Sequence, residues 1–144
     1  MLFHNDININ WNNFYNIKLP FDANVVNTIF QDSNKLIWIG TKRGLVNYNG
    51  YNYHLCYYGK NMPDHNTVQA IAQFGNDLFV GTDNGIRKLN LLTWHFEQTD
   101  NEINKVKAVR ALVFFDDKLW IGTREEGLMY YDMPTGKLHR IPSK

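Results

Sequence analysis

One short string of residues occurs three times at a constant interval in this chain of 144 residues. The string Trp38-Ile39-Gly40-Thr41 returns as Phe79-Val80-Gly81-Thr82 and again as Trp120-Ile121-Gly122-Thr123, and 41 residues separate successive copies. A period of roughly 20–50 residues is typical of proteins that stack copies of one supersecondary unit. The chain is therefore predicted to fold as three similar units.

The similarity between the units extends to both sides of this string. Upstream, Val26-Asn27-Thr28-Ile29 matches the segments that begin at Val68 and Val109, and downstream each unit has a glycine followed by leucine or isoleucine. These glycines, Gly44, Gly85 and Gly127, suit a left-handed or bulged position in a hairpin.

Within a unit, short β-branched and aromatic runs alternate with clusters of Asn, Asp and Gly, which indicates strands rather than helices. The first unit predicts strands over 25–31, 36–41, 45–48 and 53–58. Asn49-Gly50 between the last two is typical of a type I′ hairpin turn, which requires positive φ at both central residues.

Four antiparallel strands in each unit of about 40 residues favour a β-propeller blade over a sandwich of hairpins. The second strand is apolar on both faces, as expected for a strand between two neighbouring blades. The predicted fold is all-β, a partial β-propeller of about three four-stranded antiparallel blades. The expected organisation is a lead-in with an outer strand at 1–24, followed by blades at 25–60, 66–101 and 107–142.

Charge and hydropathy exclude several classes of partner. The net charge is +1, so no nucleic acid or anionic membrane surface is expected as a partner. The longest apolar runs, such as 111–115, are far shorter than the ~20 residues of a membrane-spanning helix, and the first residues do not resemble a signal peptide. One cysteine, Cys56, cannot form an internal disulfide and leaves the redox compartment open.

The run from Gln31 to Leu45, with Trp-Ile-Gly-Thr followed by Gly-Leu, closely resembles the two-component regulator propeller repeat. The resemblance covers residues 25–141, although Lys35 stands where the family usually has glycine. It implies the periplasmic, carbohydrate-sensing part of a hybrid two-component system of the kind abundant in gut Bacteroidetes such as Bacteroides. It also implies a histidine kinase elsewhere in the full-length protein, so the chain looks like an N-terminal fragment of a sensor or a truncated relative.

Side chains that vary between the units are the best candidates for ligand binding. They follow the second strand of each unit, where the flanking Thr and Gly recur, or precede the first strand, and loops of this kind carry function on a fixed scaffold. The candidates are Lys42, Arg43, Asp83, Asn84, Arg124, Glu125, Asn24, His65 and Asn66.

Other residues are interpreted as structural. The aromatic residues at 38, 79 and 120 are expected to pack between blades rather than to stack on sugar rings. His54, His95 and His139 fall at matching repeat positions, but matching positions on outer strands diverge, so no metal is predicted. Asp116-Asp117 and Glu125-Glu126 lie in predicted turns, which does not favour a catalytic carboxylate pair, and Cys56 is expected to pack.

The sequence therefore predicts a noncatalytic propeller segment of an extracytoplasmic sensor, without a catalytic residue or a cofactor, whose full-length form binds an oligosaccharide. A stand-alone protein-interaction scaffold is the alternative, and a propeller lyase or glycosidase is a weaker one. Three blades leave two open ends, so self-association through these ends is also expected.

Overall fold

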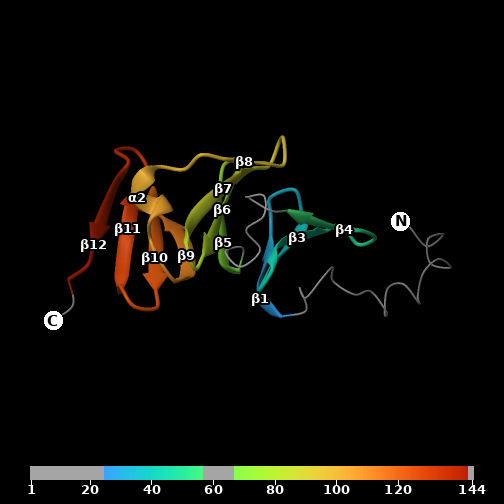
Figure 1. The fold of residues 1–144 in the computed structure, drawn as a ribbon. Coiled ribbons are helices and arrows are strands. Elements are labelled where there is room, and N and C mark those ends of the chain that lie inside the picture. Colours follow the sequence, from blue (N-terminus) through green and yellow to red (C-terminus); the bar gives the residue numbers. More distant parts are fainter. Residues whose placement is uncertain (1–24, 57–66, 143–144) are drawn as a thin grey trace.

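The computed structural model of this chain describes residues 25–56 and 67–142. They form three four-stranded antiparallel sheets, each built from consecutive strands, and a single short helix (Figure 1). The predicted fold, a partial β-propeller of three four-stranded blades, is confirmed.

Each blade pairs its strands in chain order, from the first strand to the fourth. Blade 1 contains β1 (Val26–Gln31), β2 (Ile37–Thr41), β3 (Gly44–Tyr48) and β4 (Tyr53–Cys56). Blade 2 contains β5 (Val68–Phe74), β6 (Asp77–Thr82), β7 (Gly85–Asn90) and β8 (His95–Glu97). After helix α2 (Asn101–Asn104), blade 3 contains β9 (Val109–Phe115), β10 (Lys118–Thr123), β11 (Leu128–Asp132) and β12 (Lys137–Arg140).

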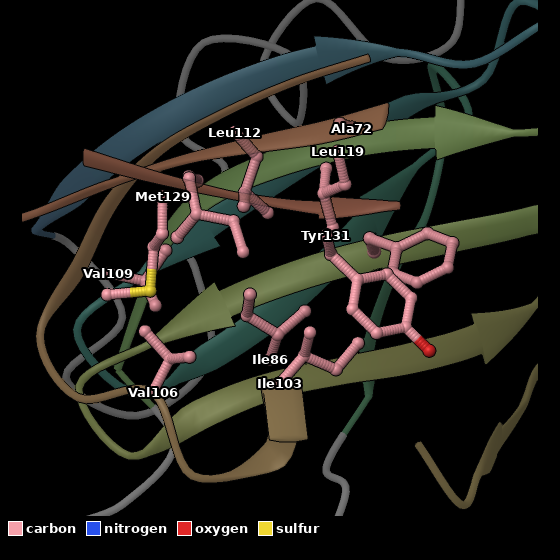
Figure 2. Packing of buried hydrophobic residues seen from close by; sticks show 12 residues of the cluster. Ala72, Ile86, Ile103, Val106, Val109, Leu112, Leu119, Met129 and Tyr131 are labelled. Carbon is pink, nitrogen blue, oxygen red and sulfur yellow. The ribbon is translucent and has the colours of Figure 1, made fainter. Parts of the chain in front are cut away.

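The blades stack face to face, with β5 in contact with β1 on one side and with β9 on the other (Figure 1). Trp38 of blade 1 packs in one buried cluster with Leu78 and Val80 of blade 2. Phe79, on the opposite face of β6, packs in a second cluster that includes Leu112, Leu119 and Ile121 of blade 3. Figure 2 shows this second cluster, in which α2 also contributes Ile103.

The expected burial of the second strand on both faces holds for the middle blade. Every residue of β6 after Asp77 is buried. In β2 and β10, by contrast, the side chains that face away from blade 2 are half-buried: Ile37, Ile39 and Trp120. Two-sided burial in this structure therefore follows from having a blade on each face.

The turns confirm one local prediction and correct another. Gly44, Gly85 and Gly127 have positive φ of 148°, 112° and 79°, as their place in the repeat predicts. The prediction of a type I′ turn at Asn49-Gly50 is wrong. Tyr48 pairs with Tyr53 across a longer loop, and of the two residues only Gly50, at φ 99°, has the positive φ that this turn requires at both. A two-residue turn with positive φ at both positions occurs instead at Asp116-Asp117.

Candidate functional site

The turns that follow β2, β6 and β10 are built around one threonine in each blade. The Thr41 hydroxyl donates to the Gly44 carbonyl oxygen at 2.8 Å and accepts from the backbone N–H of Arg43 at 3.1 Å. Thr82 makes the equivalent bonds with Gly85 and Asn84, at 2.8 and 3.0 Å. A hydroxyl can both donate and accept, so one side chain satisfies two backbone groups of the turn.

The third turn keeps this arrangement although it is one residue longer. The Thr123 hydroxyl donates to the Gly127 carbonyl oxygen and accepts from the Glu126 N–H, both at 2.8 Å. The recurring Thr and Gly thus have a structural role, and the residues between them are free to differ. The Gly-Thr-x-x-Gly string is a hairpin turn, not a phosphate-binding loop, because a strand rather than a helix follows it.

The side chains between threonine and glycine differ in charge from blade to blade. Lys42, Asp83, Arg124 and Glu125 are exposed, while Arg43 and Asn84 are half-buried. Blade 1 presents two cations, blade 2 an acid and an amide, and blade 3 a mixture of both charges. We call this end of the three blades the turn face.

The connectors that lead into the first strands reach the turn face, as predicted. The Thr67 hydroxyl donates to the Lys42 carbonyl oxygen at 2.7 Å, and the Ala108 N–H donates to the Asp83 carbonyl oxygen at 2.9 Å. Lys107 donates through Nζ to Asn84 Oδ1 at 3.0 Å. The turns of blades 1 and 2 are thus each tied to the connector of the next blade, and in blade 3 the Arg124 N–H donates to the carbonyl oxygen of the same connector residue, Ala108, at 2.9 Å.

Helix α2 borders the same face and was not predicted from the sequence. Asp100 caps the helix by accepting a hydrogen bond from the Glu102 N–H at 2.8 Å. The sequence Asp100-Asn101-Glu102 is a helix-start signal of the kind that could have predicted it. A Cβ atom on Gly85 would lie 2.2 Å from the Asn104 carbonyl oxygen, so the helix sits directly on the β6–β7 turn. Burial and a hydrogen bond with Asp100 raise the pKa of Tyr131 to about 12.

The structure therefore brings together six of the nine predicted ligand-binding residues: Lys42, Arg43, Asp83, Asn84, Arg124 and Glu125. The other three, Asn24, His65 and Asn66, lie outside the described residues. Ligand binding by any of the nine stays a prediction.

The three histidines that were predicted to match do not all share a repeat position. His54 pairs with Asn47, and His139 pairs with Tyr130, at equivalent places in β4 and β12. The residue of β8 at this place is Glu97 rather than His95, because the β7–β8 hairpin extends one pair further, to Asn90 and His95. Throughout residues 25–56 and 67–142, no group of three or more His, Cys, Asp or Glu could hold a metal ion.

Cys56 packs against the buried cluster between blades 1 and 2, as expected. Burial raises the pKa of its thiol from 9.0 to about 11. Because the thiolate is the nucleophile, iodoacetamide at pH 8 should alkylate the folded chain roughly 100-fold more slowly than the chain unfolded in denaturant. The folded-state rate should rise with pH up to about 11, and a profile that levels near pH 9 would contradict the burial of this thiol.

Comparisons with known proteins agree with the repeat and with the propeller fold. Residues 20–43 match the family model described as two component regulator propeller. No curated protein matches the chain. The extracellular domain of BT4673 from B. thetaiotaomicron, named as a hybrid two component system, is similar at 33% identity with a TM-score of 0.77 over 89% of this chain.

Two further structures support the fold alone. The extracellular domain of BT3049 from B. thetaiotaomicron, also named as a hybrid two component system, is 23% identical with a TM-score of 0.66, and the match covers 84% of this chain and 19% of that one. The Pan2 WD40 domain of Neurospora crassa is 11% identical with a TM-score of 0.55, and the match covers 83% and 39%. The chain spans 17% of the BT4673 domain. None of the helices within the described ranges is long and apolar enough to span a bilayer.

Proposed function

Because the chain carries the repeat of the two-component regulator propeller family, we propose that it is a noncatalytic propeller segment of an extracytoplasmic sensor, periplasmic in location, that binds an oligosaccharide. The full-length protein is then a hybrid two-component system with its histidine kinase elsewhere. The observation that carries the proposal is the turn face. It holds three turns in fixed positions while the presented side chains change.

The chemistry of the turn face suits a hydroxyl-rich ligand. Lys42 and Asn84 can donate hydrogen bonds, whereas Asp83 and Glu125 can only accept them when ionised. Sugar hydroxyls do both, and a sugar carboxylate adds a partner for the cations of blade 1. Mixed donors and acceptors on one exposed face therefore favour a saccharide over a strongly charged polymer.

Binding without catalysis is supported by the position of the carboxylates. Asp116 and Asp117 occupy a two-residue turn at the end of β9, away from the turn face. Glu126 forms an ion pair with Arg140 at 3.7 Å. Hydrolysis of a glycoside by the usual mechanism needs two carboxyl groups that face each other across the bond, roughly 5–10 Å apart. A sensor needs only different affinity for two arrangements of its domains, which ligand binding then shifts.

The test is isothermal titration of the chain with neutral and uronic-acid-containing oligosaccharides of four to eight sugars. We expect binding by at least one of them, and we expect Lys42→Ala and Glu125→Ala each to weaken it about tenfold, the effect of one charged hydrogen bond. Lys137→Ala is the matched control, because Lys137 is exposed at the opposite end of blade 3. Binding that all three variants retain, or no binding at all, would contradict the proposal.

The alternative function, a scaffold for protein interaction, is favoured by a separate observation. Large apolar side chains remain exposed on the two outer blades, among them Ile29 in blade 1 and Val113 and Phe115 in blade 3. These side chains are not part of the turn face.

A further inference from the structure

Positive charge gathers at the turn face, although the net charge of the chain is only +1. In blade 1 the turn itself contributes Lys42 and Arg43. Arg87 in β7 reaches the turn of blade 2, because its Nη2 donates to the Asn84 carbonyl oxygen at 3.1 Å. Lys107 reaches the same turn from the connector, through its bond to Asn84 Oδ1. The net charge of the chain therefore does not describe this end of the molecule.

Blade 3 adds two further cations to the turn face. Arg124 lies in the turn itself. Arg110 follows Val109, the residue of β9 that pairs with Thr123 at the beginning of that turn. Both arginines are exposed. Each of the three blades thus presents positively charged side chains at this end.

Acids are fewer than cations at the turn face. Asp83 and Glu125 are exposed there. Glu126 is paired with Arg140 at 3.7 Å, so these two residues together add no net charge. Among the described residues, the cations of the turn face therefore outnumber its acids.

Acids predominate at the opposite end of blades 2 and 3. The hairpin turns at that end contain or border Asp77, Asp116, Asp117 and Asp132, with Lys118 and Lys137 as cations. Lys118 lies 3.4 Å from Asp116. Opposite charges are thus separated along the length of the blades, and an anionic ligand is attracted to the turn face in particular.

The turn face stays open when blades stack on one another. Blade 2 is covered on both faces by its neighbours. Asp83 in its turn is nevertheless exposed, and so is Lys107 in the connector to blade 3. Stacking buries the faces of a blade and leaves its ends in solvent. The exposure of these charges therefore does not depend on what lies beyond blades 1 and 3.

The cations are spread over successive blades and do not form one compact cluster. Ala108 bonds through its N–H to the turn of blade 2 and through its carbonyl oxygen to the turn of blade 3. Lys107 therefore lies between these two turns, with Arg124 on the far side and the cations of blade 1 beyond blade 2. A single small anion would meet one of these turns, whereas a chain of sugars with acidic groups at intervals can meet several.

We propose that the turn face binds an acidic oligosaccharide, whose carboxylate or sulfate groups pair with cations of successive blades. This inference rests on the proposed saccharide binding and names the class of saccharide. A guanidinium group such as that of Arg124 can hold a carboxylate through two parallel hydrogen bonds. Neutral, hydroxyl-bearing rings between the anionic groups leave room for Asp83 and Glu125, which would repel a densely charged polymer.

Isothermal titration with matched pairs of oligosaccharides tests the preference for charge. The acidic members are oligogalacturonides, which carry carboxylates, and chondroitin fragments, which carry carboxylates and sulfates. The neutral members are the same oligosaccharides with methyl-esterified carboxylates and without sulfates. We expect at least one acidic member to bind about tenfold more tightly than its neutral counterpart, and this advantage to shrink between about 0.05 and 0.5 M NaCl. Desulfated chondroitin fragments that keep their carboxylates distinguish the two anionic groups.

Variants with equal changes in net charge test which end of the blades binds. Asp83→Asn removes an acid from the turn face, so it should tighten binding of the acidic oligosaccharide about two- to fivefold. Asp117→Asn makes the same change at the opposite end and should leave the affinity unchanged. Lys107→Gln should weaken binding about five- to tenfold, whereas Lys137→Gln at the opposite end should not. Circular dichroism checks that each variant is folded.

The outcomes separate this inference from the proposed function. Neutral oligosaccharides that bind as tightly as their acidic counterparts would overturn the inference and leave saccharide binding intact. If no oligosaccharide of either kind binds, both are wrong. Equal effects of the matched variants at the two ends would exclude the turn face as the site. Single-stranded DNA is the last ligand, and DNA that binds as tightly as the best acidic oligosaccharide would reveal a general polyanion surface and overturn the inference.

Discussion

Replacing Trp38 by alanine should lower the free energy of unfolding by about 4 kcal/mol, as expected for truncating a large buried aromatic residue. Trp38 is fully buried between blades 1 and 2, with its ring 5.3 Å from that of Trp94. Its Nε1 donates to Asp32 Oδ2 at 2.8 Å, and Asp32 is itself buried. The substitution therefore opens a cavity and also removes a partner from a buried carboxylate, both of which destabilise the fold.

Trp120→Ala is the matched control for this experiment, because Trp120 occupies the same position in β10 on a face that no blade covers in the described structure. Its loss should cost about 1 kcal/mol when the chain is monomeric, since much of the ring is already in water. Urea unfolding followed by circular dichroism measures both values. Trp38→Phe separates the causes further and should cost about 1–3 kcal/mol, mainly for the hydrogen bond to Asp32. Equal losses for Trp38→Ala and Trp120→Ala would contradict the blade interface.

Gly81→Ala should lower the free energy of unfolding by about 2–3 kcal/mol, although it adds a single methyl group. The added Cβ would lie 2.5 Å from Val109 Cγ1 and 3.3 Å from Leu112 Cδ1, so blades 2 and 3 would have to move apart. The effect should be largely rescued by Val109→Ala in the same chain, because the double variant removes the methyl group that clashes. A double-mutant cycle in urea measures this coupling.

Gly122→Ala is the control at the equivalent position and should change the stability of the monomer by less than about 1 kcal/mol. Its Cβ would meet Ala111 Cβ at an ordinary 3.4 Å. The measurement is made at a protein concentration where the chain is monomeric. If Gly122→Ala were as destabilising as Gly81→Ala, the cost would come from the strand itself and not from the neighbouring blade.

The repeat made much of the fold predictable. Three copies of one pattern at equal spacing indicate three copies of one unit, and the strand-like runs within each copy define its four strands. The threonine and glycine that frame the turn at Lys42 and Arg43 also appear in each copy, so the turn face could be located before its hydrogen bonds were known. The four-stranded unit and the turn face could both be predicted without tertiary contacts, because both follow from similarity among the three repeats.

Features that differ between the repeats were not predictable in this way. The β7–β8 hairpin is longer by one pair than its counterpart in blade 1, which removes His95 from the position that the spacing predicts. Asn49-Gly50 lies in a four-residue loop whose Asn49 side chain accepts from two backbone N–H groups, so these local hydrogen bonds override the signal of the Asn-Gly pair. Lys35 adopts φ 69° where a glycine was expected, held by its N–H bond to the Asp32 carbonyl oxygen.

The stacking of blades also determines how resistance to local opening is distributed along the chain. In stacked repeats, stability is approximately the sum of what each unit contributes alone and what each contact with a neighbour adds. Within the described residues, blade 2 has two such contacts and each outer blade has one. In a hydrogen-exchange experiment, the amide protons of β6 should therefore exchange with water only when most of the structure opens, while those of β4 and β12 should exchange through fraying at the outer strands. The middle repeat is thus the part of the described structure that should open last.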